Sequence, residues 1–352
     1  MPLLYKGTHR TKIAILPRNS IRAITQNFNS PAMLQYHDEW VVTSCIKCKD
    51  QYCMRYNEYE IECESFPDFA YERNFDVCPV SAIKWDYTEE LPRIDNTACI
   101  GCGLCATRCP VGAIYKSEGN MKISSTSSPV SIEAYSEESI LAQAELVRQL
   151  KNIAWDRRFQ CENDTIMEQL YYHAGQFSGR SLAPNLMVRN ILIALGFHCS
   201  VSRSGDVYTR IDAVYETSHS WDKIKGAVEI EFGRDTLEAS RGILDDIAVL
   251  HSRNGICKND NVALVVCLSF PNKRQGYFQV IKDVKKVLDL NIQTISLGAL
   301  LILMWNGAFV NMASNEFYVD FDNMSIRNAM EYRLGRQINI TEGKLGILEP
   351  EK

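Results

Sequence analysis

The run Cys99-Ile-Gly-Cys102-Gly-Leu-Cys105-Ala-Thr-Arg-Cys109-Pro110 is the most informative segment of this 352-residue chain. Three cysteines separated by two residues each let one short loop bring several thiolates to a common centre. The intervening glycines allow backbone N–H groups to approach the sulfur atoms. A proline follows the fourth cysteine and turns the chain away there. This spacing predicts cysteine-ligated metal binding.

A second copy of the end of this motif lies upstream. Cys109-Pro-Val-Gly-Ala-Ile has its twin in Cys78-Pro-Val-Ser-Ala-Ile, and a further Cys-x₂-Cys pair, Cys45 and Cys48, precedes it. With this duplication the sequence resembles the bacterial 2[4Fe–4S] ferredoxins over about eighty residues. A zinc ribbon built from the same cysteines is the alternative, and the two Cys-Pro signatures favour iron–sulfur.

The resemblance implies two [4Fe–4S] clusters and their ligands. One cluster would take Cys78, Cys99, Cys102 and Cys105. The other would take Cys45, Cys48, Cys109 and a third cysteine of the first motif. Cys53 is the expected third ligand, and Cys63, which lies in an insertion that departs from the ferredoxin pattern, is the alternative. No G-x-G-x-x-G follows a predicted strand, so structural or sensing clusters compete with electron transfer as the interpretation.

Composition and charge narrow the class of protein. Nine of the 13 cysteines lie between Cys45 and Cys109, a clustering that indicates metal binding rather than disulfides. The net charge of −5 excludes a uniformly basic protein but leaves room for a locally basic face that binds nucleic acid. No apolar run reaches the length of a membrane span, and no signal-peptide pattern is present, so a cytoplasmic location is expected.

The sequence predicts an α+β ferredoxin-like iron–sulfur domain followed by an α/β restriction-endonuclease-like domain. Residues 1–37 are unassigned, 38–123 form the first domain, 124–136 form a polar linker and 137–352 form the second domain. In the second domain we expect a mixed central sheet flanked by helices. A helix is predicted after Ser136. The other predicted helices cover 186–195, 235–251 and 280–288, and the predicted strands cover 207–215, 227–232, 262–270 and 293–296.

Three acidic residues of the second domain form a candidate metal site. On a strand, Glu229 and Glu231 project from one face, while Val228, Ile230 and Phe232 point the other way, into the core. If the strand of Asp212 pairs alongside, three carboxylates converge and repel one another unless a cation neutralises them. Hard oxygen ligands with an incomplete shell suit Mg²⁺. The alternative is an ordinary half-exposed strand whose acidic residues face solvent.

The order of elements around Val-Glu-Ile-Glu-Phe-Gly, residues 228–233, resembles the PD-(D/E)XK nuclease core, specifically the BamHI/BglII-type restriction endonucleases. The resemblance implies that Asp212 and Glu229 bind the metal together with the backbone carbonyl of Ile230. Glu231 would position or deprotonate the attacking water. Asn185 or Asn190, on the preceding helix, would assist.

The same resemblance implies DNA contacts from Arg210, Arg234, Lys273 and Arg274. The implied function is a Mg²⁺-dependent DNA endonuclease, a type II restriction or defence enzyme that hydrolyses phosphodiester bonds in double-stranded DNA. The resemblance also implies a homodimer and a cognate DNA methyltransferase. The iron–sulfur domain would be an accessory that serves DNA binding, structure or redox sensing. Two other hypotheses stand: a ferredoxin-type electron-transfer protein with a catalytically silent C-terminal interaction domain, and a DNA-repair nuclease with structural clusters.

Overall fold

The computed structural model describes residues 51–109, 113–117, 120–123, 162–177, 181–206, 208, 210–217, 224–233, 236–271, 276–308 and 326–346, with residue 45 and five short strands before 43. The chain divides into two compact units. Met1–Arg55 and Asp76–Cys161 form the first, and Tyr56–Phe75 and Glu162–Lys352 form the second. The sequence predicts one continuous domain over 38–123, whereas the structure places 56–75 in the second unit.

The N-terminal residues that the sequence leaves unassigned contain short strands. β1 (Tyr5–Lys6), β2 (Thr11–Ile15) and β3 (Arg22–Gln26) form an antiparallel sheet. β4 (Gln35–His37) pairs with β5 (Trp40–Val42).

The duplication in the cysteine motifs is repeated in the structure of the first unit. β6 (Ile83–Asp86) follows Cys78-Pro and pairs with β7 (Leu91–Ile94). β8 (Ile114–Ser117) follows Cys109-Pro in the same way and pairs with β9 (Asn120–Ile123). A short helix, α2 (Leu104–Arg108), precedes the second copy. Each Cys-Pro-Val segment therefore leads into a hairpin, and the first residues of β6 and β8 are both buried.

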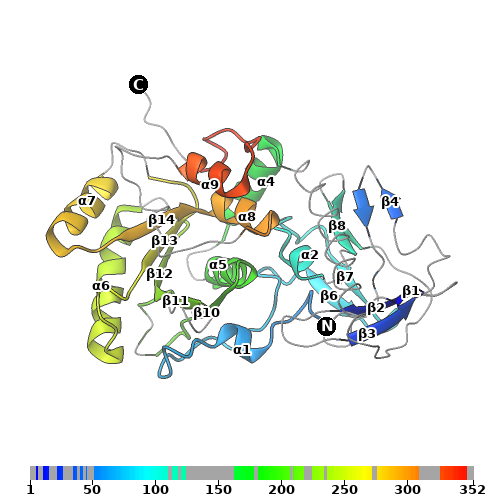
Figure 1. Ribbon diagram of the computed structural model, residues 1–352, viewed down its shortest axis with the longest axis horizontal. Helices are drawn as coiled ribbons and strands as arrows, with labels where there is room; N and C mark the ends of the chain where they lie inside the picture. The colour runs from blue at the N-terminus through cyan, green and yellow to red at the C-terminus, as the bar shows by residue number, and fades with distance from the viewer. Residues whose placement is uncertain are drawn as a thin grey trace. The chain divides into compact units, whose positions relative to one another are not determined.

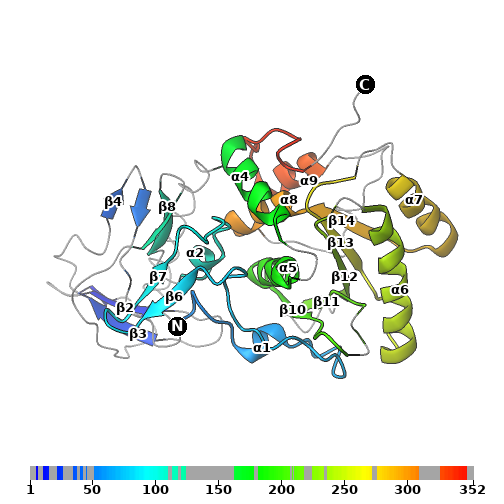
Figure 2. The ribbon, with the colours of Figure 1, turned by 180° about the vertical axis from the view of Figure 1, so that it is seen from behind.

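The described part of the second unit is built on a five-stranded mixed sheet in the order β10-β11-β12-β13-β14. β10 (Phe197–Val201), β11 (Ala213–Thr217) and β12 (Lys225–Glu231) are antiparallel neighbours. β13 (Ala263–Cys267) and β14 (Ile292–Ser296) extend the sheet in parallel. α6 (Thr236–Asn254) and α7 (Gly276–Leu288) lie on one side, and α5 (Ala183–Ala194) and α8 (Leu297–Trp305) on the other (Figures 1 and 2). This mixed sheet flanked by helices agrees with the architecture that the sequence predicts for the second domain.

Several predicted elements recur with shifted ends. The helix predicted over 186–195 is α5, which begins earlier because Pro184 suits the first turn of a helix. The strand predicted over 207–215 corresponds to β11, which ends two residues later and begins later, because the Ile211 N–H donates to the Tyr208 carbonyl and closes a turn there. The helix predicted after Ser136 lies outside the described residues. Within the described ranges, no helix is long and apolar enough to cross a membrane.

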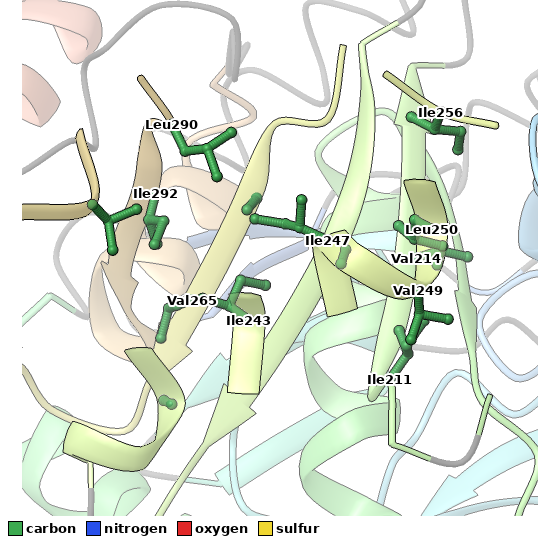
Figure 3. Close-up of a cluster of buried hydrophobic side chains, with 14 of the residues drawn as sticks. Ile211, Val214, Ile243, Ile247, Val249, Leu250, Ile256, Val265, Leu290 and Ile292 are labelled. Carbon is green, nitrogen blue, oxygen red and sulfur yellow. The ribbon is translucent and has the colours of Figure 1, made fainter. Parts of the chain in front are cut away.

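A large hydrophobic core lies between the sheet and α6 (Figure 3). Ile243, Ile247 and Leu250 recur at helical spacing and belong to one buried cluster with Val265 of β13 and Ile292 of β14. Burial of each such side chain stabilises the fold by roughly 1.5–3 kcal/mol.

Residues 56–75 contribute to this same core. Phe66 is 2% exposed, and Cys63, Phe66 and Phe69 all belong to the buried cluster of the second unit. The segment opens with a short helix, α1 (Glu58–Ile61), and Tyr71 forms an antiparallel bridge with Ser202. These apolar side chains are the physical reason that the insertion packs with the second unit.

A buried carboxylate holds the turn of this insertion. Glu216 of β11 is 7% exposed, and its two oxygens accept hydrogen bonds from the backbone N–H groups of Glu64 (2.6 Å) and Ser65 (2.9 Å). Hydrogen bonds to a charged group contribute about 1.5–3 kcal/mol each. The contact therefore fixes the insertion to β11, the strand that follows Asp212.

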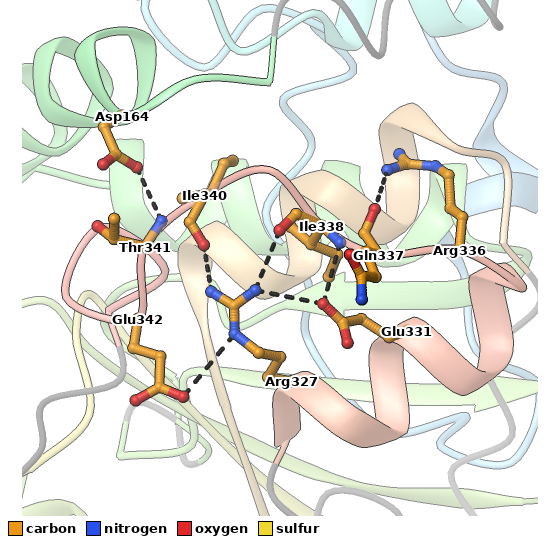
Figure 4. Close-up of polar contacts among 9 residues, drawn as sticks. All are labelled: Asp164, Arg327, Glu331, Arg336, Gln337, Ile338, Ile340, Thr341 and Glu342. Atoms are coloured by element: carbon orange, nitrogen blue, oxygen red, sulfur yellow. Dashed lines mark hydrogen bonds and ion pairs between the residues drawn. The ribbon is translucent and has the colours of Figure 1, made fainter.

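The C-terminal segment is held by polar contacts to α9 (Ile326–Leu334) and α4 (Asp164–Gly175) (Figure 4). Arg327 donates to the carbonyls of Ile338 and Ile340 and pairs with Glu331 at 3.2 Å. The Thr341 N–H donates to Asp164 at 2.8 Å. One guanidinium thus satisfies two carbonyls of a segment that has no regular structure of its own.

Candidate functional site

The three predicted acidic residues lie on neighbouring strands. Asp212 immediately precedes β11, Glu229 and Glu231 lie on β12, and Ala213 is paired with Val228. Because of this register, Asp212 reaches the β12 backbone, and its Oδ2 accepts a hydrogen bond from the Ile230 N–H at 2.9 Å. The structure therefore brings Asp212 next to the Glu229–Glu231 segment.

One of the two candidate asparagines contacts this group. The Asn185 Nδ2 donates to the Asp212 Oδ1 at 3.1 Å, so α5 orients the aspartate. Asn190 is fully buried further along the helix, where its Oδ1 accepts from Arg189 at 2.9 Å and its carbonyl accepts from the Tyr56 hydroxyl at 3.2 Å. Asn190 therefore contributes to the packing of Tyr56 against α5.

Burial and mutual repulsion govern the protonation of the acids. Burial, and then the neighbouring Asp212 and Glu231 carboxylates, raise the pKa of Glu229 from 4.5 to about 8. Burial also raises the pKa of Asp212, against the opposing effect of hydrogen bonds from Ile230 and Asn185. Without a cation, the acidic group therefore retains a proton near neutral pH. This proton reduces the repulsion between the carboxylates, as the positive charge of a metal ion would.

A fourth acid, which the sequence analysis did not single out, joins this group from α6. Asp246 is 1% exposed and hydrogen-bonded to Glu229, and its pKa is raised to about 9 by burial and then by Glu229. In the sequence, the feature that could have indicated this role of Asp246 is Gly242, which lies four residues earlier on the same face of the helix. Next to Asp245, Asp246 resembles part of a solvated helix face, which explains why it was overlooked.

The expected orientation of β12 needs correction. Val228 is fully buried, but Ile230 and Phe232 are only partly buried, and the face that carries Glu229 is covered by α6. Gly242 makes this possible, because a Cβ there would lie 2.7 Å from the Glu229 Oε1. The site is thus enclosed on the glutamate side, and the solvated-strand alternative does not describe Glu229.

Of the four predicted DNA-contacting residues, one lies among the residues that the structure describes. Arg210 is half-exposed and pairs with Asp245 at 2.9 Å. Arg234, Lys273 and Arg274 lie outside the described residues.

The cysteines of the first unit fall into two groups. Burial raises the pKa of Cys102 to about 12, and the thiols of Cys78 and Cys99 add to this effect. Burial raises the pKa of Cys105 well above its ordinary value, and Cys102, Cys53, Cys99 and Cys78 raise it further. The Ala82 N–H donates to the Cys78 Sγ at 3.2 Å.

The second group contains Cys45, Cys53 and Cys109. Burial raises the pKa of Cys53, and Cys109 and Cys45 raise it further. The Ala113 N–H donates to the Cys109 Sγ at 3.1 Å, as Ala82 does to Cys78 in the other copy. Cys48 lies outside the described residues.

Cys63 lies elsewhere, in the core of the second unit. It is 3% exposed, and its thiol donates weakly to the Val214 carbonyl at 3.7 Å and lies 3.6 Å from the Ser200 hydroxyl. Of the two candidate third ligands, the structure places Cys53 with Cys45 and Cys109.

In the part of the chain that the structure describes, no three Cys, His, Asp or Glu side chains form a ready-made site for one metal ion. A [4Fe–4S] cube differs from such a site, because each of its cysteines binds a different iron atom. Buried neighbouring thiols at the predicted spacing fit such a cube. At the acidic group, a cation would replace the proton between Glu229 and Asp246.

Comparisons with known proteins concern mainly the cysteine-rich segment. Residues 92–115 match the 4Fe-4S binding domain family. An uncharacterized ferredoxin of Methanocaldococcus jannaschii is 46% identical over 41 residues, 11% of this chain and 25% of that protein. The uncharacterized ferredoxin-like protein YdhY of Escherichia coli K12 is 30% identical over 71 residues, 20% of this chain and 24% of that protein. The chain spans about a quarter of the length of these relatives.

These matches identify a ferredoxin-type iron–sulfur domain in the first unit. Among solved structures, the restriction endonuclease FokI aligns with 59% of this chain and 38% of its own chain, at 13% identity and a TM-score of 0.27. A likeness of that size carries no argument about the second unit, whose interpretation depends on its own residues.

Proposed function

We propose that the second unit is a Mg²⁺-dependent DNA endonuclease of the BamHI/BglII type, a type II restriction or defence enzyme with an accessory iron–sulfur domain. One observation carries the proposal: Asp212, Glu229 and Glu231 gather on adjacent strands, with Asn185 bonded to the aspartate. Buried carboxylates that repel one another are stabilised when a cation replaces the shared proton.

Hard oxygen donors fit Mg²⁺, and Asp212, Glu229 and the Ile230 carbonyl would hold it. When bound, the metal polarises a phosphate oxygen and lowers the pKa of a water molecule. The chain supplies the remaining functions. Asn185 and the Ile230 N–H keep Asp212 in one orientation.

Glu231 is the residue that would handle the proton of the attacking water. It lies at the end of β12, is partly exposed, and its carboxylate accepts a hydrogen bond from the Gly233 N–H. A carboxylate that is partly exposed at the end of a strand can accept a proton and release it to bulk water.

In the first unit, we propose two [4Fe–4S] clusters. Cys78, Cys99, Cys102 and Cys105 would bind one. Cys45, Cys48, Cys53 and Cys109 would bind the other. The clusters would help to bind DNA, maintain structure or report redox state. Double-stranded DNA would be the substrate, contacted by Arg210, Arg234, Lys273 and Arg274. A homodimer and a cognate DNA methyltransferase complete the proposal.

The test incubates anaerobically purified protein with Mg²⁺ and unmethylated phage and plasmid DNA. Discrete fragments are expected from the wild type, none from Glu229→Gln, and a rate roughly 10²–10⁴-fold lower from Glu231→Gln. Glu238→Gln, which removes an exposed carboxylate at the start of α6, is the matched control and should cleave normally.

Other outcomes would select the other hypotheses. Absence of cleavage together with reversible cluster reduction by a cellular donor would favour an electron-transfer protein. Cleavage confined to ends, flaps or lesions would favour a repair nuclease.

A further inference from the structure

Asp246 is the buried acid that the proposed chemistry leaves without a role. It lies in the middle of α6, is 1% exposed, and is hydrogen-bonded to Glu229. An ionised carboxylate is rarely buried to this degree unless an ion or a hydrogen-bond network compensates for its lost hydration. Its position therefore requires an explanation beyond helix packing.

The surface of α6 is shaped around the Glu229 carboxylate. Gly242 and Asp246 are four residues apart and lie on one face of the helix. A Cβ at 242 would lie 2.7 Å from the Glu229 Oε1 and 3.0 Å from its Cδ. The missing side chain at 242 thus admits the glutamate, and the next turn presents a second carboxylate to it.

A second, independent observation concerns the free oxygen of Asp246. Its Oδ2 is buried and has no hydrogen-bond partner among the described residues. Burying a polar oxygen without a hydrogen-bond partner is unfavourable, whether or not the carboxyl group is ionised. Asp212 and Glu229 both act electrostatically on Asp246, so the free oxygen belongs to the same acidic group.

We propose that Asp246 is a further metal ligand, which would close with Asp212, Glu229 and the Ile230 carbonyl around a cation that the described acids do not enclose in its absence, while Glu231 stays free for the water. This inference rests on the proposed function and adds to it a ligand from α6. The three carboxylates come from the start of β11, from β12 and from α6. Glu231 lies at the end of β12 and is partly exposed, whereas Asp246 is the only one of these four carboxylates that is fully buried.

The division of roles follows from exposure. Metal ligands are best enclosed, because low water access strengthens their attraction to the cation. A proton acceptor for water needs contact with solvent. Asp246, which is 1% exposed, satisfies the first requirement, and the partly exposed Glu231 satisfies the second.

The test measures Mn²⁺ binding to the full-length, cluster-loaded protein by titration calorimetry, without DNA. Asp246→Asn should weaken binding by at least about 10–100-fold. Asp245→Asn is the matched control, since Asp245 is adjacent, half-exposed and paired with Arg210, and it should bind Mn²⁺ as the wild type does. Asp246→Ser is measured in parallel, so that loss of folding in one variant leaves the other as a test.

Thermal unfolding supplies a readout that a merely structural role would not move. Without metal, Asp246→Asn should unfold at the same or a higher temperature than the wild type, because it removes a repelling carboxylate. With Mn²⁺, its midpoint should rise far less. Wild-type Mn²⁺ affinity in both Asp246 variants would overturn the inference while leaving the proposed function intact. Absence of Mn²⁺ binding in the wild type, or wild-type binding by Glu229→Gln, would overturn both.

Discussion

Replacing Glu229 with glutamine should change the pH dependence of stability in the metal-free protein. Burial, followed by the Asp212 and Glu231 carboxylates, raises the pKa of Glu229 in the folded chain, whereas the unfolded chain has the ordinary value. Between these two values the folded state keeps a proton that the unfolded state has lost. Stability is therefore fully present below about pH 4.5 and declines as the pH rises toward about pH 8.

The magnitude follows from the shift. A rise from 4.5 to about 8, at about 1.4 kcal/mol per pH unit, corresponds to a loss on the order of 5 kcal/mol across that window. Asp246 shares the proton with Glu229, so the pair is counted once. Glutamine stays neutral at every pH. The free energy of unfolding of Glu229→Gln minus that of the wild type should thus be near zero at low pH and rise steadily with pH.

Urea unfolding followed by circular dichroism, in metal-free buffer from about pH 5 to about pH 9, measures this difference. Glu238→Gln is the control, because that carboxylate is exposed and pairs with Arg241 at the surface. Its difference from the wild type should stay within about 0.5 kcal/mol at all pH values. A flat difference for Glu229→Gln would show that its carboxylate is not held in a buried, repelling group, and would refute the reasoning.

Three further predictions concern the cysteines, the insertion and α6. Cys53→Ala should lose about half of the bound iron and Cys63→Ala should keep all of it, as measured by iron and sulfide analysis; the opposite pattern would make Cys63 the ligand. Phe66→Ala should lower the free energy of unfolding of the second unit by roughly 3–5 kcal/mol with the iron content unchanged, because its side chain is 2% exposed in that core. Retained stability in urea would argue against that packing. Gly242→Ala should weaken Mn²⁺ binding, because its Cβ would meet the Glu229 Oε1 at 2.7 Å, and calorimetry showing wild-type affinity would contradict this contact.

The sequence alone predicted the features that depend on local spacing. Cysteines two residues apart, and a Cys-Pro segment repeated ahead of each hairpin, are set by covalent distances along the chain. The alternation of Glu229 and Glu231 on one strand is equally local, because side chains on a strand alternate with a period of two. The mixed sheet followed from such short patterns, with element ends shifted by a few residues.

Only the tertiary structure distinguished between residues with equivalent local patterns. Asn185 and Asn190 lie on one helix about 140° apart around its axis, and which of them meets Asp212 depends on how α5 packs on the sheet. Cys53 and Cys63 are both candidates for the third ligand, yet Cys63 packs with the apolar residues 66 and 69 in the core of the second unit. Asp246 faces Glu229 only because Gly242 lets α6 approach β12. Each of these contacts joins segments far apart in the sequence, so its outcome is decided by the packing of whole elements and not by local pattern.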